Sequence, residues 1–598
     1  AIDGELKAPG SGYANEGGSY ALSHTHTTQE NLYLAANLNY QINKDWEVHG
    51  FLREEYFNQY AQYNSESTNG GLIVPNQFFI KNSKQQASFN AYKFNTKRIV
   101  STIFMIGTSW KNQLFLDITG RNDWSSALVY SYGTGNFSYF YPSVSGSWII
   151  TETFKDKLPK WVSFAKVRGS WAQVGNDTSP YYINSGYSVA TYQRGDKKIY
   201  GMTIPENMKS TNLKPERKNA WEVGLDWRFL DSRIGVDLTY YKENTRNQIM
   251  TINVPWESGV KEKLINAGNI QNSGIEIALN TTPIKKKQWQ WDLNFTYTRN
   301  RNKIVELSPD VTSYINLDGA ANYGNYRIAS VAKVGSDYGM LMSDSWIKTD
   351  EKTGKPVVGY TNKFRTVYYK RGGTVKEVGS MLPNFLGSLN STLRWKDLSL
   401  YVLFDARFGG YVASYNSRYA TAYGFSGETE KYRKGMTWTS KYANAQDKVF
   451  TDGFIPDVVF DAGTIVTTPG GTNQDVSGMT YQEAYEKGYV EPAHLQSAAY
   501  FKNSWGTGVI NDDWFKKINY IALREITLSY NVPTKISSYI GAKNLSLSFT
   551  GRNLAYLLNT APNHENPESV RGTGAAQFRM RSFMPYTASY LFTLNATF

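Results

Sequence analysis

Cysteine is absent from the 598 residues of the chain. The sequence therefore holds no disulfide framework, no thiolate zinc site and no cysteine nucleophile. Long apolar runs are also absent, because none approaches the roughly 18 residues that a membrane-spanning helix needs. The mean hydropathy is -0.48. These absences exclude an α-helical membrane protein, although they do not settle the compartment.

Histidine is scarce, and the known catalytic patterns are missing. The sequence contains no HExxH string, no nucleophile-elbow string and no glycine-rich phosphate loop. Only the first two histidines lie near each other in the full set of His24, His26, His49, His494 and His564. The sequence thus predicts no enzyme activity, no catalytic residue, no metal site and no cofactor.

Positive charge is in excess but is not concentrated. The formal net charge is +13 and the isoelectric point is about 9.2. Lysine and arginine are scattered, apart from the run at residues 285–287, which lies in a predicted turn. Scattered charge is typical of a solvated surface. We therefore expect no nucleic-acid partner.

Aromatic residues are abundant, at 15% of the chain, and they follow an alternating pattern. Four segments within residues 217–298 alternate apolar and polar side chains, as strands do because successive side chains face opposite sides. The first segment places on one face Trp221, Val223, Leu225, Trp227 and Phe229. No helical period fits, so the pattern predicts two hairpins of one sheet, the first turning at residues 230–233.

Two environments produce such alternation, namely a soluble sandwich and the wall of a membrane barrel. The apolar faces here carry aromatic residues toward the strand ends, which is typical of the interfacial girdles of an outer-membrane barrel. The polar faces carry charges, which a water-filled or plugged lumen tolerates. No shift in composition marks a linker. We predict an all-β fold, specifically a transmembrane antiparallel β-barrel.

Eight strings carry a resemblance to a known family, and they occur in family order. They are TGRNDWSS (119–126), YFYPSVSGSWIITE (139–152), KVRGSWAQVGND (166–177), LKPERKNAWEVGLDWRF (213–229), NAGNIQNSGIEI (266–277), LPNFLGSLNSTLRWKDLSL (382–400), YIALREITLSYNVP (520–533) and LSFTGRNL (547–554). The chain resembles the SusC/RagA family of TonB-dependent outer-membrane transporters. The resemblance extends from about residue 30 onward.

The alternating segments predict about fifteen strands, joined in turn by tight turns and long loops. An odd number would leave two parallel end strands that cannot close an antiparallel barrel, with unpaired backbone groups in lipid. We therefore expect the C-terminal part of a larger barrel of roughly 22 strands. The resemblance implies that the first strands, the N-terminal plug and the TonB-binding segment are missing. Residues 1–29 are then the remnant of an external loop, and residues 30–598 are the barrel part.

The resemblance implies active import across the bacterial outer membrane. A SusC-like transporter would import oligosaccharides or oligopeptides with a SusD-like surface lipoprotein, driven by TonB through the missing N-terminal region. Outer-membrane lipid would surround it, and a dimer of transporter–lipoprotein pairs is expected. The alternative is a structural or assembly component that uses the same barrel without transport. A barrel-embedded hydrolase is the rival enzyme class, but the sequence lacks a nucleophile held by a histidine at a strand end.

The long connections are the predicted ligand-binding elements. Residues 300–381 and 410–513 are far longer than a hairpin needs, and loops of that length are usually functional or disordered. They supply aromatics and amides rather than a cationic cluster, so we expect a neutral or weakly charged ligand, first a glycan and second a peptide. The predicted contacts, for which packing between the loops is the alternative role, are Tyr323, Tyr326, Tyr415, Tyr419 and Tyr423.

The C-terminal segment predicts an insertion signal. One face of a terminal strand carries Tyr590, Phe592, Leu594 and Phe598, and this resembles the signal by which outer-membrane barrels are recognised. Deletion of Phe598 should lower the amount of protein in the outer membrane without changing the activity of the inserted molecules. Immunoblots of outer-membrane fractions measure this amount, and normal surface abundance would contradict the prediction.

Overall fold

The computed structural model describes residues 2–8, 18–155, 157–195, 197–254, 257, 259–308, 314–318, 328–343, 346–363, 365–372, 375–422, 425, 427, 435–493, 515–570, 578–580 and 585–598. Strands account for 66% of the structure and helices for 7%, which confirms the predicted all-β class. In the part of the chain described, no helix has the length and apolar character needed to cross a membrane.

The chain divides into two compact units. The first comprises Ala1–Asp226, Tyr241–Gln271 and Glu306–Pro309, and the second comprises Trp227–Tyr240, Asn272–Val305 and Asp310–Phe598. Four long strands contribute residues to both units: β11 (Glu216–Phe229), β12 (Ile234–Asn253), β13 (Glu262–Lys286) and β14 (Trp289–Glu306).

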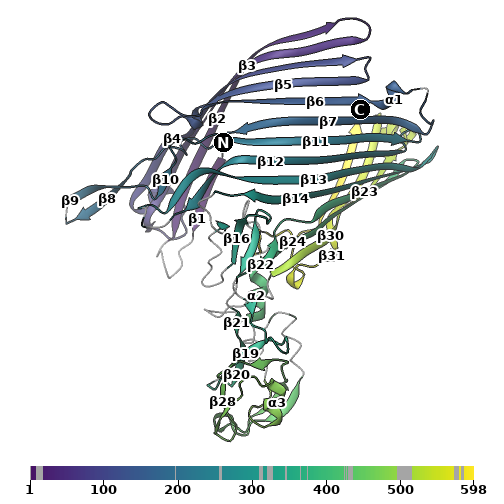
Figure 1. Ribbon diagram of the computed structural model, residues 1–598. Coiled ribbons are helices and arrows are strands. Elements are labelled where there is room, and N and C mark those ends of the chain that lie inside the picture. The colour runs from purple at the N-terminus through teal and green to yellow at the C-terminus, as the bar shows by residue number, and fades with distance from the viewer. Residues whose placement is uncertain are drawn as a thin grey trace. The chain divides into compact units, whose positions relative to one another are not determined.

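The first unit is built on an antiparallel ladder in which β1 to β7 pair in chain order (Figure 1). Its strands are β1 (Ile2–Ala8), β2 (Ser19–Gln41), β3 (Trp46–Leu72), β4 (Ser83–Trp110), β5 (Leu114–Ser125), β6 (Ser138–Ile149) and β7 (Val162–Asn176). Its short elements are η1 (Ile80–Asn82), η2 (Ser126–Leu128), α1 (Ile150–Thr153), β8 (Ser188–Arg194), β9 (Lys197–Thr203) and β10 (Asn207–Lys209).

The second unit continues the same design, with β14, β23, β24, β30, β31 and β33 paired antiparallel in that order. Its long strands after β14 are β23 (Phe385–Trp395), β24 (Leu398–Ser414), β30 (Phe515–Val532), β31 (Asn544–Asn559) and β33 (Ser589–Thr597). Its short elements near these strands are α2 (Tyr415–Ala422), α5 (Thr534–Ser537), η8 (Ser538–Ile540), η9 (Pro562–His564) and β32 (Arg579–Met580).

The two long connections of the second unit are folded. The first supplies β15 (Tyr314–Asp318), β16 (Ile328–Lys333), β17 (Met340–Ser343), β18 (Trp346–Ile347), β19 (Val357–Thr361), β20 (Thr366–Tyr369), β21 (Arg371–Gly372) and β22 (Lys376–Ser380). The second supplies β25 (Met436–Thr439), η6 (Ala443–Ala445), β26 (Val449–Gly453), β27 (Val459–Phe460), β28 (Ile465–Thr467), β29 (Asn473–Asp475) and α3 (Tyr481–Glu486). Val358, Phe460 and Tyr481 share one buried core, so the two connections fold together.

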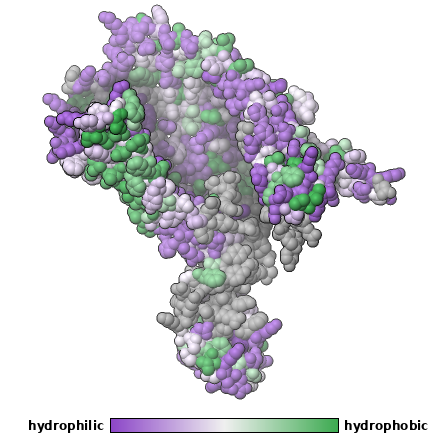
Figure 2. All heavy atoms as spheres, turned by 180° about the vertical axis from the view of Figure 1, so that it is seen from behind, coloured by the Kyte–Doolittle hydropathy of each residue, from purple (hydrophilic) through white to green (hydrophobic). Residues whose placement is uncertain are grey.

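The alternating faces that the sequence predicts are present. Within the described residues, fifteen strands have nine or more residues: β2 to β7, β11 to β14, β23, β24, β30, β31 and β33. Their apolar rows are exposed, as Leu34, Leu52 and Ile106 show in the first unit. Figure 2 shows hydrophobic residues gathered in patches on the outer surface. A chain that exposes such rows on paired strands has the lipid-facing surface of a membrane barrel.

The tight turn predicted at residues 230–233 is present, and tryptophan pairs flank other turns. Residues 230–233 connect β11 to β12, and three of them have positive φ. Next to two other turns, the rings of Trp46 and Trp110 lie 6.4 Å apart and those of Trp289 and Trp395 lie 5.6 Å apart. Paired indoles at one end of the strands fit an interfacial aromatic girdle.

Hydrogen-bonded strands extend beyond the alternating segments at two places. β1 pairs with the start of β2, which begins at Ser19. β3 continues to Leu72, and β4 begins at Ser83. These extensions carry polar residues on both faces, so the apolar alternation ends before the hydrogen-bonded ladder does. The location of residues 1–29 in an external loop stays a prediction.

The facing of β11 can be tested at two adjacent positions. Leu225→Arg should impair insertion by about 2 to 4 kcal/mol, because a cation on the lipid face near the bilayer midplane is costly. Asp226→Asn, on the opposite face, should be tolerated. Gel migration of unboiled samples, in which a folded barrel runs as a compact band, measures insertion. Equal tolerance of the two substitutions would show that the facing is wrong.

Candidate functional site

A polar pocket of about 740 Å³ lies on the polar face of the first unit. It is lined by residues of β3, β4 and β5 and of the segment that follows β7, among them Glu55, Gln59, Lys97, Arg121, Asn176 and Asp177. Strand alternation explains this lining, because odd-numbered residues of β3 face the pocket while Leu52 on the same strand belongs to the exposed apolar row. The alternation of side chains along β3 thus places apolar residues on the lipid face and polar residues in the pocket.

Both cations of the polar pocket are already paired. Lys97 Nζ lies 2.5 Å from Asp177 Oδ1. Arg121 Nε lies 2.7 Å from Asp123 Oδ1, and its Nη1 lies 3.8 Å from Glu55 Oε2. The charges therefore cancel locally, and the pocket offers amides and hydroxyls. This chemistry suits a ligand of low or balanced charge.

Two hydroxyl groups take part in this cluster, one at the carboxylate of Asp123 and one at the guanidinium of Arg121. Asp123 is buried and accepts a hydrogen bond from the Tyr141 hydroxyl, while Arg121 donates to Ser101 Oγ at 3.0 Å. The Tyr141 ring stacks on Tyr139, with centroids 5.9 Å apart. Gly175 makes this arrangement possible, because a Cβ at that position would lie 2.5 Å from the Tyr139 ring.

Sequence reasoning did not assign these residues, although a signal was present. Arg121 and Asp123 stand two positions apart on the polar face of one strand, and Asp177 ends the string 166–177. Only the register of four paired strands, β3 to β6, brings Glu55, Arg121 and Tyr141 to one place. The sequence shows the charged residues on the polar face of β5, but it does not show which residues of β3 and β6 lie beside them.

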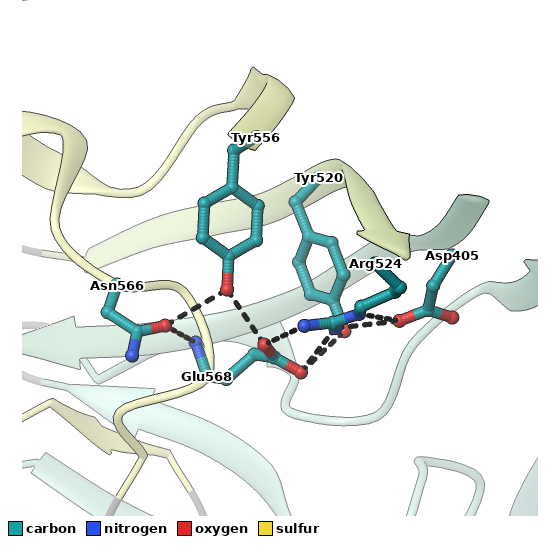
Figure 3. A network of polar contacts seen from close by, with 6 residues as sticks. All are labelled: Asp405, Tyr520, Arg524, Tyr556, Asn566 and Glu568. Atoms are coloured by element: carbon teal, nitrogen blue, oxygen red, sulfur yellow. Dashed lines mark hydrogen bonds and ion pairs between the residues drawn. The ribbon is translucent and has the colours of Figure 1, made fainter. Parts of the chain in front are cut away.

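A second polar cluster, the Arg524 network, lies in the second unit (Figure 3). Arg524 on β30 donates to Asp405 Oδ2 on β24 at 2.8 Å. It also donates to both carboxylate oxygens of Glu568, at 2.8 and 2.7 Å. Tyr556 on β31 donates to Glu568 at 2.7 Å and Tyr520 on β30 does so at 3.3 Å. The network ties the segment that follows β31 to three strands.

Two carboxyls of this segment have opposite pKa shifts. Burial opposes ionisation of Glu568, but hydrogen bonds from Arg524 and Tyr556 outweigh it, so the pKa of Glu568 is lowered. Burial raises the pKa of Glu565 despite hydrogen bonds from Asn416 and Ser414. A lowered pKa means that the Glu568 contact stabilises the segment above the ordinary carboxyl pKa, and that this stabilisation is lost as pH falls through the lowered value.

The predicted ligand-binding tyrosines lie in different parts of the chain. Tyr323, Tyr326 and Tyr423 lie outside the described residues, and only the backbone of Tyr419, in α2, is described. Tyr415 is 2% exposed and packs in a core cluster with Leu341, Met381, Ala413, Phe515 and Phe578. Neighbouring side chains therefore cover the ring of Tyr415. The five ligand contacts stay predictions.

The predicted insertion signal lies on β33. Tyr590, Phe592 and Leu594 expose one face of the strand, and Phe598 after the strand end is exposed too. The Tyr590 ring stacks on Phe549 of β31, with centroids 6.2 Å apart. The facing agrees with the sequence pattern, while the recognition role stays a prediction.

Two histidines pair with single carboxylates. His24 contacts Asp3, and His49 Nε2 lies 3.4 Å from Asp117 Oδ1. Over the described ranges, no group of three or more potential ligands is arranged to hold a metal ion. The first contact joins the neighbouring strands β1 and β2, and the second joins β3 to β5 across β4.

Comparison with known proteins places this geometry among outer-membrane barrels. Residues 3–416 match the family model described as TonB dependent receptor-like, beta-barrel. TonB-dependent receptor P26 of Formosa agariphila is 23% identical over 486 residues, which cover 79% of this chain and 43% of that protein. TonB-dependent receptor SusC of Bacteroides thetaiotaomicron is 27% identical over 270 residues, which cover 43% of this chain and 26% of that protein.

A solved structure shares the fold. The chain matches "Structure of the RagAB peptide transporter" with a TM-score of 0.67 and 16% identity, over 97% of this chain and 56% of that one. The chain thus spans about half the length of the relatives that it matches.

Breaking the Arg524 network should loosen the segment at residues 561–570. Arg524→Gln removes the bidentate partner of Glu568, and because Glu568 and Asp405 are more than a third exposed we expect a loss of only about 1 kcal/mol. Hydrogen exchange of this segment should become about fivefold faster.

The matched control for this experiment is Arg552→Gln. Arg552 pairs with Glu525 at 2.8 Å on the same sheet but does not contact residues 561–570 in the described structure. Its loss should leave exchange of the segment unchanged. Unchanged exchange in Arg524→Gln as well would mean that the network does not hold the segment.

Proposed function

Since the chain belongs to the TonB dependent receptor-like β-barrel family of the bacterial outer membrane, we propose that it is the barrel part of a SusC-like importer of oligosaccharides or oligopeptides. The observation that carries this proposal is the polar pocket on the face opposite the lipid-facing rows. A polar pocket on the inner face of a membrane barrel serves passage or binding of a polar ligand, since neither lipid contact nor packing needs it.

The charges of the polar pocket support a ligand that is neutral or weakly charged. Lys97 and Arg121 are both held by carboxylates, so neither offers a free cation to a polyanion. Gln59 and Asn176 add amide groups to the lining, and amides bind sugar hydroxyls and peptide groups equally well. A glycan is our first choice and a peptide our second. The tyrosines at 323, 326, 415, 419 and 423 remain proposed further contacts.

The proposed mechanism needs two partners. A SusD-like surface lipoprotein would capture the ligand and close over the barrel, and TonB would act through an N-terminal plug region to open a path. Support comes from the likeness to SusC and from the fold shared with the RagAB peptide transporter. We further propose that two transporter–lipoprotein pairs form a dimer.

The ligand can be identified and its binding measured on the full-length complex. Mass spectrometry of the complex isolated from its own membrane should find a co-purified oligosaccharide or oligopeptide. Affinity for that ligand should change by less than about threefold between low and high salt, because few charges are neutralised on binding. A highly charged ligand with a steep salt dependence would contradict the predicted ligand class, and the absence of any transported ligand would contradict import.

A pair of variants on β3 tests whether the polar pocket takes part. Gln59→Ala should weaken binding by about fivefold, as expected for the loss of one hydrogen bond. Gln62→Ala, three residues along the same strand and on its opposite face, should have no effect. Equal affinity in both variants would exclude Gln59 as a ligand contact.

A further inference from the structure

The hairpin of β8 and β9 is a feature that the proposed function does not use. These strands pair in register from Ser188 with Thr203 to Arg194 with Lys197 and form a sheet of their own. Figure 1 shows the hairpin extending past β10 and β4. An isolated two-stranded hairpin is marginally stable in water. We therefore expect the hairpin to be stabilised by contact with another molecule.

One face of the hairpin is apolar and exposed. Val189 lies opposite Met202, and Thr191 lies opposite Tyr200, so these side chains share a face. Met202 is 76% exposed and Tyr200 is 72% exposed. Tyr187 and Ile204 flank the strands and are likewise exposed. A contiguous apolar patch of this kind marks an interaction site rather than a solvated surface.

A notch at the base of the hairpin extends the apolar face. It has a volume of about 310 Å³, and its lining includes Tyr187, Ile204, Pro205 and Met208. A notch of this size accommodates one large side chain. Anchor side chains that fill such pockets contribute most of the binding free energy at protein interfaces.

The base of the hairpin is held rigidly. Ile183 and Leu213, on either side of the hairpin in sequence, are buried in one cluster with Tyr130 and Leu264. The Tyr130 hydroxyl donates to the Ser210 carbonyl oxygen at 2.7 Å and accepts from the Leu213 backbone N–H at 2.9 Å. A fixed base preorganises the hairpin and so lowers the entropy that a partner must overcome on binding.

The tip of the hairpin is cationic. Arg194, Lys197 and Lys198 stand there with one acidic residue, Asp196, so the sequence of the tip is positive in net charge. A tip of net positive charge next to an apolar face favours a partner with acidic groups around an apolar side chain. A symmetric contact between two copies of the hairpin would bring like charges together, which is unfavourable.

We propose that the β8–β9 hairpin and its basal notch are a docking arm for the surface lipoprotein, with an apolar side chain of the lipoprotein in the notch and its carboxylates at the tip. The identity of the partner rests on the proposed function. The hairpin lies beyond the end of β7, after the strand residues with lipid-facing rows, and this position favours a protein partner over the bilayer.

The test uses the full-length complex with its co-purified lipoprotein. The double variant Tyr200→Ser with Met202→Ser should raise the dissociation constant of the lipoprotein at least about tenfold, as loss of interface anchors does. Lys197→Glu with Lys198→Glu should slow association at low salt and reverse the sign of its salt dependence, because like charges then face each other. The matched control is Tyr539→Ser, because Tyr539 is 89% exposed in η8, in the short connection between β30 and β31, and should change nothing.

The outcomes separate this inference from the proposed function. Wild-type affinity in both hairpin variants, with a compact heat-modifiable barrel band, would overturn the docking arm and leave import standing. A hairpin variant that loses the dimer but keeps the lipoprotein would also overturn it, since the occupant would then be a second copy. A wild-type protein that carries no lipoprotein would overturn both proposals.

Discussion

Backbone hydrogen bonding in lipid is the constraint on which the rest of this structure depends. No water is available there, so each N–H and C=O of a spanning strand must be paired with a neighbouring strand. The continuous ladders from β2 to β7 and from β23 to β33 meet this requirement. Because side chains alternate along each strand, the same ladders also separate an apolar lipid face from a polar face.

The polar face is arranged so that its charges neutralise each other. Arg121 lies between Asp123 and Glu55, and Arg524 lies between Asp405 and Glu568. Buried or half-buried charges are costly unless they are paired and hydrogen-bonded. In the first unit this pairing leaves a pocket of low net charge. In the second unit it fastens a connecting segment to the strands.

Chain outside the ladders is organised by separate small cores. The two long connections fold together around Val358 and Phe460, and the segment around the β8–β9 hairpin is held by Tyr130 and Leu213. These connections do not contact lipid. Their apolar side chains are therefore buried in cores of their own, as in soluble domains. This explains why Tyr415 is a core residue, although its surroundings in sequence suggest an accessible loop.

The sequence by itself determined the fold class, the number of long strands and the position of the tight turn at residues 230–233. Each depends on local alternation, which lipid imposes residue by residue, as in Trp221 to Phe229. The sequence did not predict that β3 continues beyond Gln59. Residues 65–69 pair with neighbouring strands but carry no apolar face, so they lack the alternation that marks a strand in the sequence. Only the tertiary structure decided that Lys97, Arg121 and Asp177 meet in one pocket, because strand register, and not sequence spacing, brings residues 80 positions apart into contact.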